Sequence, residues 1–545
     1  MCAGIATIAI VTLLLSNAQA EDYAMDEGNK IQLLNVSLWL DQPSWDPTGQ
    51  TLAWLQQESS GAWVFELWIS DLTNPGNEVR FVQATEEIRN SPIAWSPNSQ
   101  FILYTTKALQ TNPLLDRPSI GRASAITPDT FDNGFIRPDD FGFANDCYDV
   151  RDPSIVLTSS GYKLIVSIIS WCDGPVYSEG IFAMDINDSA VPNLASVVKI
   201  LNTSNLFVNS VLSPDGDTLL VEQPWTPTSR RLFAIEGIAD VLSGSTQPIT
   251  GIGANPLVHL LNPEDTYATN PQASQDGSLI FYTVDITGTF DESDPGTYAS
   301  SDHDIAVVKR EDAIVDIPNP RFLNSDGHQK ALHSADGGTR FAFVDVNFTT
   351  GVSLNLGTLN ISTTIFVDQS GVSAEEIILE DGSGLRLVLP AGTTIGGIAI
   401  PGDGLITITV YTPITPFQEL ALADLAGVKL TRLFGPNGIT ITPPQGSTAT
   451  LTVRYTDAEI LGLDESNLNI VEYGNGPPLT LTVVSRDLVN NTLTVEITGF
   501  SKFALADGFI RPPGVGMPIS PWSMAILILV IIVFSAVLIK QKSPA

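Results

Sequence analysis

Short apolar runs, each preceded by a polar turn, recur along the first two thirds of the chain. The clearest copy places Ser213-Pro214-Asp215-Gly216 just before the apolar run Leu219-Leu220-Val221. A second apolar run follows each copy and ends near an aspartate, as in Leu67-Trp68-Ile69-Ser70-Asp71. Runs of this length, bounded by turn residues, are typical of β-strands. The pattern therefore predicts antiparallel strands joined by tight turns.

The turn-and-strand phrase occurs six times. Its copies occupy residues 45–54, 95–104, 157–166, 212–221, 273–282 and 333–342. The position of Gly216 recurs in them at intervals of 50, 62, 55, 61 and 60 residues. Such intervals are typical of propellers in which each repeat forms one four-stranded sheet. We therefore expect a six-bladed ring completed by a strand over residues 35–40, or seven blades if residues 352–367 join it.

The turn chemistry explains why acidic residues recur at one position of the phrase. Proline fixes one backbone angle, the aspartate bonds its own backbone, and glycine adopts a positive φ. A catalytic carboxylate is needed once, whereas a turn carboxylate is needed in every repeat. We therefore expect structural roles for the turn acids, which are Asp46, Asp215, Asp276 and Asp336.

With these residues, positions 30–350 resemble the TolB-type propeller repeat, whose phrase is Trp-Ser-Pro-Asp-Gly followed by a strand that ends near Asp. The resemblance implies a closed ring of radial sheets. Closure would protect sheet edges that an open array leaves exposed. The phrase carries little information about activity.

The texture of the sequence changes past residue 355, where Thr, Ile, Val, Gly and Pro dominate. Short runs there alternate apolar and polar residues or stop at Pro and Gly. They cover residues 385–393, 405–411, 449–455, 479–484 and 492–498. This pattern predicts an antiparallel β-sandwich.

Five segments of this half resemble the β-sandwich shared by ankyrins and netrin receptors, over residues 357–507. They are residues 387–393, 434–438, 451–455, 462–468 and 499–505. Some members cleave themselves at a His-Phe-Ser step, where the histidine takes the proton of the attacking serine. Gly499 stands in place of that histidine here, so we expect Ser501 to be structural. Residues 508–521 then form a Pro/Gly linker with a sorting motif.

An apolar run lies near each end of the chain. Residues 5–15 are too few to span a bilayer and precede Ala18-Gln19-Ala20, so residues 1–20 predict a secretory signal cleaved before Glu21. A buried N-terminal strand is the alternative. Residues 522–539 are uncharged and precede two lysines, which predicts a transmembrane helix with residues 540–545 in the cytoplasm. A buried core helix is the alternative there.

The stretch from Pro518 to Met524 resembles the IPTL-type C-terminal sorting signal. That family is read by a membrane-bound processing protease in Gram-negative bacteria. The usual Pro-Thr-Leu-Ser-x-Trp is Pro-Ile-Ser-Pro-Trp in this chain. The resemblance implies the cell envelope as location and the sorting protease as partner, with a single-pass anchor if the signal is not cleaved.

Composition and charge narrow the possible partners. The chain has 545 residues, of which 43% are hydrophobic, enough for two or three domains. Its net charge of −34 argues against nucleic acid as a partner. Once the signal has been removed, Cys147 and Cys172 are the remaining cysteines. In an oxidising compartment they predict one disulfide, and two buried thiols are the alternative.

We find no motif of an enzyme active site in the sequence. There is no Gly-x-Ser-x-Gly nucleophile elbow and no phosphate-binding loop with lysine, and the four histidines never pair at metal-ligand spacing. One loop is rich in acids that could hold Ca²⁺ through hard oxygen ligands. These candidate ligands are Asp291, Asp294, Asp302 and Asp304. A solvated acidic loop is the alternative.

Taken together, these patterns predict an exported all-β protein: a six-bladed propeller, an antiparallel β-sandwich and a C-terminal transmembrane helix. We expect a scaffold that is not an enzyme and that binds a protein, peptide or glycan. The alternative is a hydrolase or lyase with its active site at the mouth of the propeller channel. Residues contributed by different blades would leave no motif in the sequence.

Overall fold

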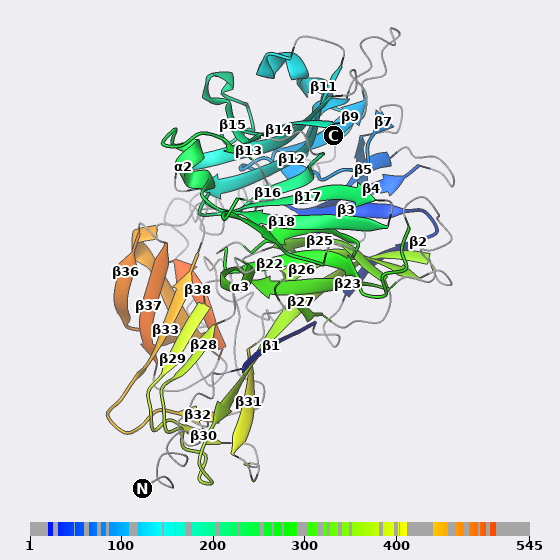
Figure 1. Cartoon of the computed structure of the whole chain (residues 1–545). Helices are drawn as coiled ribbons and strands as arrows, with labels where there is room; N and C mark the ends of the chain where they lie inside the picture. The colour runs from blue at the N-terminus through cyan, green and yellow to red at the C-terminus, as the bar shows by residue number, and fades with distance from the viewer. Residues whose placement is uncertain are drawn as a thin grey trace, which may run out of the picture.

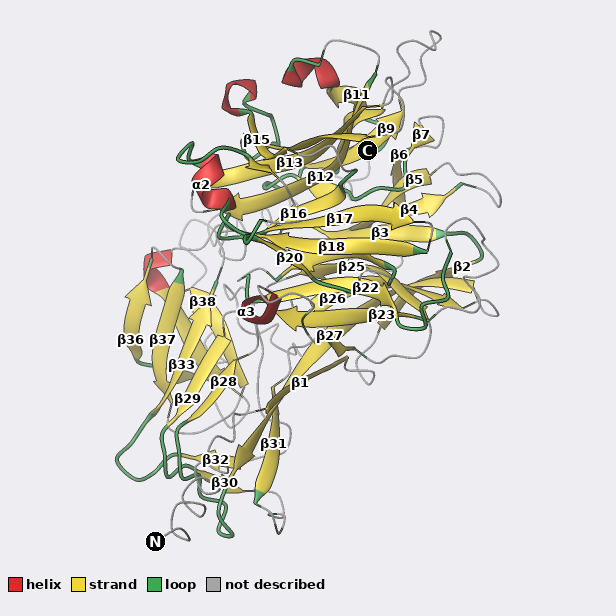
Figure 2. Ribbon diagram, viewed as in Figure 1, coloured by secondary structure: helices red, strands yellow, loops and turns green. Residues whose placement is uncertain are grey.

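The computed structural model describes the chain between residues 20 and 507, with gaps. The described residues are 20–25, 31–47, 49–58, 65–72, 78–82, 87–107, 118–143, 147–158, 160–170, 177–202, 206–226, 228–250, 255–263, 266–274, 277–291, 302–313, 318, 320–323, 328–335, 340–347, 351–380, 385–396, 400, 402, 404–410, 440–455, 465–473, 479–488, 491–497 and 502–507. Strands dominate them, so the predicted all-β class is confirmed (Figure 2).

Four-stranded antiparallel units follow one another along the first part of the chain. The first unit is β3 (Leu40–Trp45), β4 (Thr51–Gln57), β5 (Phe65–Asp71) and β6 (Val79–Val82). The second is β8 (Ala94–Trp95), β9 (Phe101–Lys107), β10 (Pro118–Ser124) and β11 (Phe131–Ile136). The third is β12 (Tyr148–Thr158), β13 (Gly161–Ser170), β14 (Tyr177–Asp185) and β15 (Val198–Asn202).

Three more units complete this part of the molecule. The fourth is β16 (Val208–Leu212), β17 (Leu219–Thr226), β18 (Ser229–Ile235) and β20 (Val258–Leu260). The fifth is β21 (Ala268–Ala273), β22 (Leu279–Asp285), β23 (His303–Lys309) and β24 (Arg321–Phe322). The last is β25 (His328–Ala335), β26 (Arg340–Asn347), β27 (Gly351–Phe366) and the N-terminal β2 (Ile31–Val36). The short β7 (Glu87–Ile88) joins the first two units, and β19 (Ile249–Thr250) extends the third.

These units close into a ring. Each first strand contacts the first strand of the next unit, in the order β3, β8, β12, β16, β21 and β25, and β25 contacts β3 again. Apolar side chains fill the space between neighbouring units, as where Ile165 and Ile181 pack with Leu219 and Val221. Figure 1 shows the sheets of consecutive units stacked against one another. A closed ring of sheets packed in this way is the β-propeller architecture.

The polar turns have the structural role that their chemistry predicts. Asp46 Oδ1 accepts the backbone N–H groups of Gln50 and Thr51 at 2.9 and 2.8 Å. Asp215 Oδ1 accepts the Ser213 hydroxyl at 2.6 Å, and Gly216 has a φ of 76°. Both aspartates therefore stabilise the turns to which they belong. The other two turn acids, Asp276 and Asp336, lie outside the described residues.

The N-terminal strand β2 supplies the fourth strand of the last unit. It pairs with β27 from Ile31 opposite Leu356 to Val36 opposite Val352. The predicted closing strand over residues 35–40 was therefore placed a few residues too late. The segment 352–367, considered for a seventh blade, lies almost wholly within β27 and pairs with β26 on its other edge. Closure by a distant segment binds the two ends of the ring together.

The strand β27 continues past the ring into a three-stranded stem. Its second half pairs with β1 (Ala20–Met25) on one edge and with β31 (Leu405–Val410) on the other. Ala20, the residue before the predicted signal cleavage point, is the first residue of β1 and faces Thr364. The single strand β27 is therefore shared by the ring and the stem.

Two further sheets beyond the stem share one apolar core. A five-stranded sheet has the order β28 (Ile377–Glu380), β29 (Leu385–Leu389), β33 (Ala449–Arg454), β37 (Thr492–Ile497) and β36 (Val483–Asp487). A three-stranded sheet has the order β35 (Leu479–Thr480), β34 (Leu468–Tyr473) and β38 (Lys502–Asp507). Leu387 and Val495 of the first sheet pack with Ile470 and Leu505 of the second. The short pair β30 (Thr394–Gly396) and β32 (Thr440–Thr442) lies beside them.

The predicted strands of this half are found with small shifts. Four of the five match β29, β31, β33 and β37. The fifth, over residues 479–484, is divided between β35 and β36, which belong to different sheets. The chain changes sheet at residues 481–482, and alternation of apolar residues alone does not report such a crossing.

Several predictions fall on residues outside the described part of the chain. They are residues 1–19 of the signal, the linker 508–521, the apolar run 522–539, the tail 540–545, and both Gly499 and Ser501. Within the described ranges, no helix combines the length and apolarity required to cross a bilayer. The short helices there are α2 (Ile238–Leu242), α3 (Arg310–Ala313), η2 (Pro138–Phe141), η3 (Leu194–Ser196) and η7 (Glu465–Asn467).

Candidate functional site

The ring has two rims that differ in the connections they carry. The turns between first and second strands, such as residues 46–51, lie on one rim, which we call the turn rim. The connections between second and third strands, such as residues 226–229, lie on the opposite rim, which we call the hairpin rim. The stem leaves from the turn rim. β26 begins at this rim with Arg340, which pairs with Thr358 of β27, and the part of β27 after Thr358 forms the stem. The hairpin rim is therefore the one that faces away from the stem.

A bulge interrupts the first strand of most units near the hairpin rim. The pairing register shifts between Asp41 and Ser44, Arg151 and Ser154, Val208 and Val211, Thr269 and Gln272, and Lys330 and His333. Four of these bulges contain a residue with φ between 49° and 55°, namely Gln42, Asp152, Asn209 and Asn270. Asn and Asp tolerate this left-handed conformation better than most residues. The bulges turn polar groups toward the neighbouring units.

Glu222 of β17 is the most heavily bonded of these polar groups. Its side chain is fully buried. Its carboxylate forms an ion pair with Arg230 and accepts the Asn209 amide at 2.8 Å, within its own unit. From the fifth unit it accepts the Thr269 hydroxyl at 2.6 Å and the Asn270 N–H at 3.2 Å. One carboxylate therefore ties the fourth unit to the fifth.

Asp152 plays a similar part between the second, third and fourth units. Its carboxylate accepts the backbone N–H of Asn209 at 3.3 Å, and its own N–H donates to the Thr105 hydroxyl at 3.1 Å. Burial raises the pKa of Asp152 above 3.8, although the charge of Arg151 lowers it. The carboxylate of Glu222 raises that pKa further. The pKa of Asp152 therefore lies above that of an exposed aspartate, chiefly because the carboxyl group is buried.

The same kind of bond links the first two units. The Asn90 amide donates to Asp41 Oδ2 at 2.9 Å. The Ser91 hydroxyl donates to Thr105 Oγ1 at 2.6 Å, in the second unit. We call the whole set the polar belt: Asp41, Asn90, Ser91, Thr105, Asp152, Asn209, Glu222, Arg230, Thr269 and Asn270. It runs through the first five units at the level of the bulges and holds them in register.

Sequence reasoning missed the polar belt, although a weak signal for it exists. A polar residue precedes proline at the bulge in Gln42-Pro43, Asp152-Pro153 and Asn270-Pro271. Proline cannot donate to a strand ladder and is confined to edges or bulges. The partner Glu222 carries no signal at all, because it is the only charged residue of its strand and stands at a different repeat position.

An exposed aromatic residue lies on the hairpin rim of the fourth unit. Trp225, near the end of β17, is 53% exposed. The guanidinium carbon of Arg231 lies 3.8 Å from the centre of its ring. Beside it, the hydroxyls of Thr226 and Thr228 lie 3.2 Å apart, and both residues are exposed. Unlike the polar belt, this group presents its surface to solvent.

The acidic loop predicted to bind calcium is also on the hairpin rim. Asp285, at its base, accepts the backbone N–H groups of Thr287, Phe290 and Asp302, which lowers its pKa against the effect of burial. Asp304 is nearly buried, and burial together with the charge of Asp302 raises its pKa to about 6.

The structure does not assemble the four predicted calcium ligands. Asp294 lies outside the described residues. In the ranges that are described, no three His, Cys, Asp or Glu side chains are grouped closely enough to hold a metal ion. The calcium site at Asp291, Asp294, Asp302 and Asp304 therefore stays a prediction.

Cys147 is disulfide-bonded. It lies just before β12, whereas its predicted partner Cys172 lies outside the described residues, in the connection from β13 to β14. Cys147 lies on the hairpin rim of the third unit. The pairing of Cys147 with Cys172 stays a prediction.

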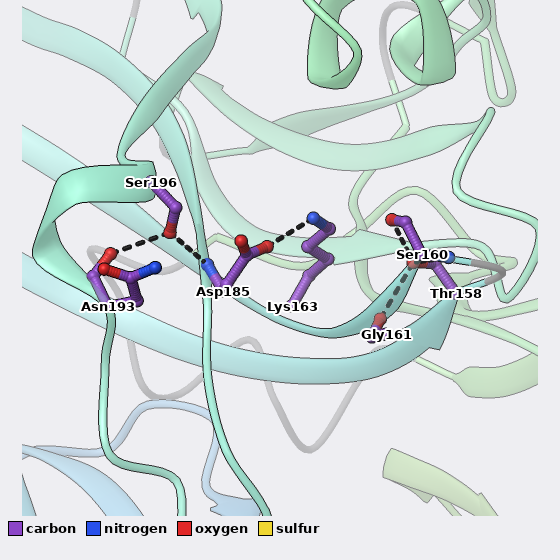
Figure 3. A network of polar contacts seen from close by, with 7 residues as sticks. All are labelled: Thr158, Ser160, Gly161, Lys163, Asp185, Asn193 and Ser196. Atoms are coloured by element: carbon purple, nitrogen blue, oxygen red, sulfur yellow. Dashed lines mark hydrogen bonds and ion pairs between the residues drawn. The ribbon is translucent and has the colours of Figure 1, made fainter.

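The third unit also carries a lysine, a serine and an aspartate close together on its turn rim (Figure 3). Lys163 forms an ion pair with Asp185. The Ser196 hydroxyl accepts the Asp185 N–H at 2.8 Å and donates to the Asn193 carbonyl at 2.7 Å. Because the serine bonds backbone groups and the lysine bonds the carboxylate, these contacts fix η3 against β14. They do not form a nucleophile and base.

Two of the four histidines have defined surroundings. The buried His303 packs edge-on against Phe290 and Tyr267, with ring centres 4.9 and 6.1 Å apart. His259 Nε2 lies 3.4 Å from Glu236. His328 and His333 lie in β25. His303 therefore has a packing role, and His259 contacts an acidic side chain of its own unit.

No family model matches the chain, and no curated protein matches it. Solved structures do. A putative TolB from Agrobacterium tumefaciens has 13% identity and a TM-score of 0.34, covering 56% of this chain and 90% of its own. An oligogalacturonate lyase in complex with manganese has 13% identity and a TM-score of 0.36, covering 63% and 96%. A puromycin-hydrolyzing peptidase of Mycobacterium tuberculosis has 13% identity and a TM-score of 0.35, covering 78% and 59%.

The expectation that this protein is not an enzyme must be corrected. The similar structures include a lyase and a peptidase alongside TolB, at low identity. The missing motifs did not justify the expectation, because residues from different units of a ring leave no local pattern. These likenesses assign no activity to this chain. The β-propeller architecture of this chain therefore rests on its own closed ring of sheets.

Proposed function

We propose that this chain is an exported protein of the cell envelope whose propeller binds a protein, peptide or glycan at the hairpin rim. The observation that carries the proposal is the position of that rim. It faces away from the stem, which leads to the strands that precede the predicted anchor in the sequence. The polar belt below it keeps the units in register, so that the rim presents a preformed surface, which lowers the entropic cost of binding.

The proposal includes the finer architecture. Six units in the ring, completed by β2, support a six-bladed propeller. The two sheets with a shared core support a β-sandwich between the ring and the predicted membrane segment. In this arrangement the sandwich is a spacer that holds the ring above the membrane.

Steric blocking of one rim at a time tests the binding site. Thr228→Cys on the hairpin rim and Ile126→Cys on the turn rim give two exposed positions for a polyethylene glycol maleimide. The full-length chain, purified in mild detergent, is screened on a glycan array and against a displayed peptide library. We expect the polymer at position 228 to abolish capture and the polymer at position 126 to leave it unchanged. The reverse result, or no capture by the unmodified chain, would refute the proposal.

Export has its own test. N-terminal sequencing of the chain from a Gram-negative host is expected to begin at Glu21, and fractionation to place the chain in the envelope. A chain that retains Met1 and stays in the cytoplasm would contradict this part of the proposal.

A hydrolase or lyase is the second candidate, and one observation favours it. Asp152 has a raised pKa beside the carboxylate of Glu222, near the hairpin end of the inner strands. A buried carboxyl group with a raised pKa is a candidate for general acid–base catalysis. Turnover of a panel of polysaccharides or peptides that Asp152→Asn abolishes, with no change in the unfolding midpoint, would establish it. Turnover unaffected by this substitution would exclude Asp152.

A further inference from the structure

The hairpin between β17 and β18 is uncharged and exposes an aromatic side chain. Its residues 224–229 are Pro-Trp-Thr-Pro-Thr-Ser, without a charged side chain, in a protein with a net charge of −34. Trp225 and the two threonines are exposed there. An exposed tryptophan beside neutral hydroxyls on an outward-facing rim suggests recognition of a neutral partner.

Arg231 fixes the plane of the indole. Its guanidinium lies over the Trp225 ring at 3.8 Å, and its strand position faces Gln223, two residues before the tryptophan. A cation on one face of the ring is attracted by its negative face and limits the rotation of the side chain. Because Trp225 is 53% exposed although the guanidinium lies over one face of its ring, part of the indole remains open to solvent. The platform is therefore ordered before any ligand arrives.

The chemistry of this platform fits a sugar ring better than a peptide. The face of a pyranose carries C–H groups with partial positive charge, which match the negative face of an indole. Its hydroxyls can exchange hydrogen bonds with Thr226 and Thr228. A peptide is commonly bound as an added strand at an open sheet edge. Here β17 is paired on both edges, with β16 and β18.

The negative net charge of the chain favours neutral glycans over acidic ones. A net charge of −34 repels an acidic polymer at long range. Resting on the proposed binding function of the hairpin rim, we infer that the Trp225–Arg231 platform binds a neutral hexose glycan, with the sugar stacked on the indole face opposite the guanidinium. A single stacked ring on an open surface gives weak binding, with a dissociation constant on the order of 1 mM.

Affinity electrophoresis measures binding of this strength. The full-length chain in mild detergent is run through native gels that contain laminarin, hydroxyethyl cellulose or galactomannan, with polygalacturonate as the acidic comparison. We expect at least one neutral polysaccharide to retard the chain and polygalacturonate not to do so. Trp225→Ala should raise the dissociation constant about tenfold, which corresponds to the loss of one aromatic contact.

Three variants separate stacking from a general structural effect. Trp225→Phe should restore part of the retardation, and Arg231→Gln should weaken binding less than Trp225→Ala, because the indole remains. Ile126→Ala, which removes a 68% exposed apolar side chain on the turn rim, should change nothing. Equal unfolding midpoints would show that all variants are folded.

The outcomes distinguish this inference from the proposal on which it rests. Retardation by no neutral polysaccharide, or retardation that survives Trp225→Ala, overturns the glycan inference. If the chain instead captures displayed peptides at the hairpin rim, the inference fails and the binding rim stands. If nothing is captured at that rim, both fail.

Discussion

Replacing Glu222 by glutamine is expected to destabilise the ring strongly. The carboxylate is fully buried and is shared by Arg230, Asn209, Thr269 and Asn270. Glutamine keeps the shape but removes the charge, and its amide N–H groups face other donors. Breaking a buried ion pair by removing one partner costs about 3–5 kcal/mol, since the other charge stays buried without compensation. The substitution therefore weakens the contact between the fourth and fifth units.

Urea unfolding followed by tryptophan fluorescence measures this effect, and Arg310→Gln is the matched control. Arg310 also joins two units through ion pairs, to Asp215 and Asp217, but these side chains on the turn rim are 46% and 39% exposed. An exposed pair is worth about 0–1 kcal/mol. In the double variant Glu222→Gln/Arg230→Gln, the second substitution should cost less than it does alone, because the guanidinium has already lost its partner.

Equal losses for Glu222→Gln and Arg310→Gln would refute the reasoning. Such a result would mean that burial of the carboxylate does not decide its contribution. Strictly additive losses at Glu222 and Arg230 would likewise contradict a shared, buried bond.

Further predictions concern pH, the disulfide and ring closure. Because burial and Asp302 raise the pKa of Asp304 to about 6, the folded state binds this proton more tightly than the unfolded chain. Stability should therefore fall as the pH rises from about 4 to 6, and Asp304→Asn should flatten that part of the profile; an identical profile in the variant would contradict it. Peptide mapping without reductant should link Cys147 to Cys172, and reduction should cost about 3 kcal/mol. A linked peptide that lacks Cys172 would disprove the pairing. Gly351→Ala should cost about 1–3 kcal/mol, because φ is 113° and the new Cβ would lie 2.7 Å from a carbonyl oxygen of β2. An unchanged unfolding midpoint would show that β2 does not hold the ring closed as described.

Calcium binding is tested by calorimetric titration of the acidic loop. If the four predicted acids form a site, calcium should release or absorb heat that Asp302→Asn removes. The absence of a heat signal at millimolar calcium would refute the predicted site.

The ring-forming units were predictable because their signals are local. A turn such as Ser213-Pro214-Asp215-Gly216 fixes the backbone within four residues, and the apolar run after it supplies one strand. The closing strand was misplaced because its position depends on β27, more than 300 residues away along the chain. The division of residues 479–484 between two sheets was missed for a related reason, since alternation does not report which sheet a strand joins.

The candidate site was largely invisible in the sequence. Trp225 follows a proline in an ordinary hairpin, and nothing local shows that Arg231 lies against its ring. Glu222 is the only charged residue of its strand, and a lone acid there suggests a solvent-facing position. The structure instead surrounds it with donors from two units.

The sequence by itself determined the all-β class, the repeated turns and the approximate strands, because these depend on hydrogen bonds and alternation within a few residues. Only the tertiary structure decided the polar belt, the closure by β2 and the orientation of the hairpin rim. Those features depend on which units become neighbours in space. The contacts between different units join residues about 50 to more than 300 positions apart, so their energy belongs to the closed ring and to no single segment.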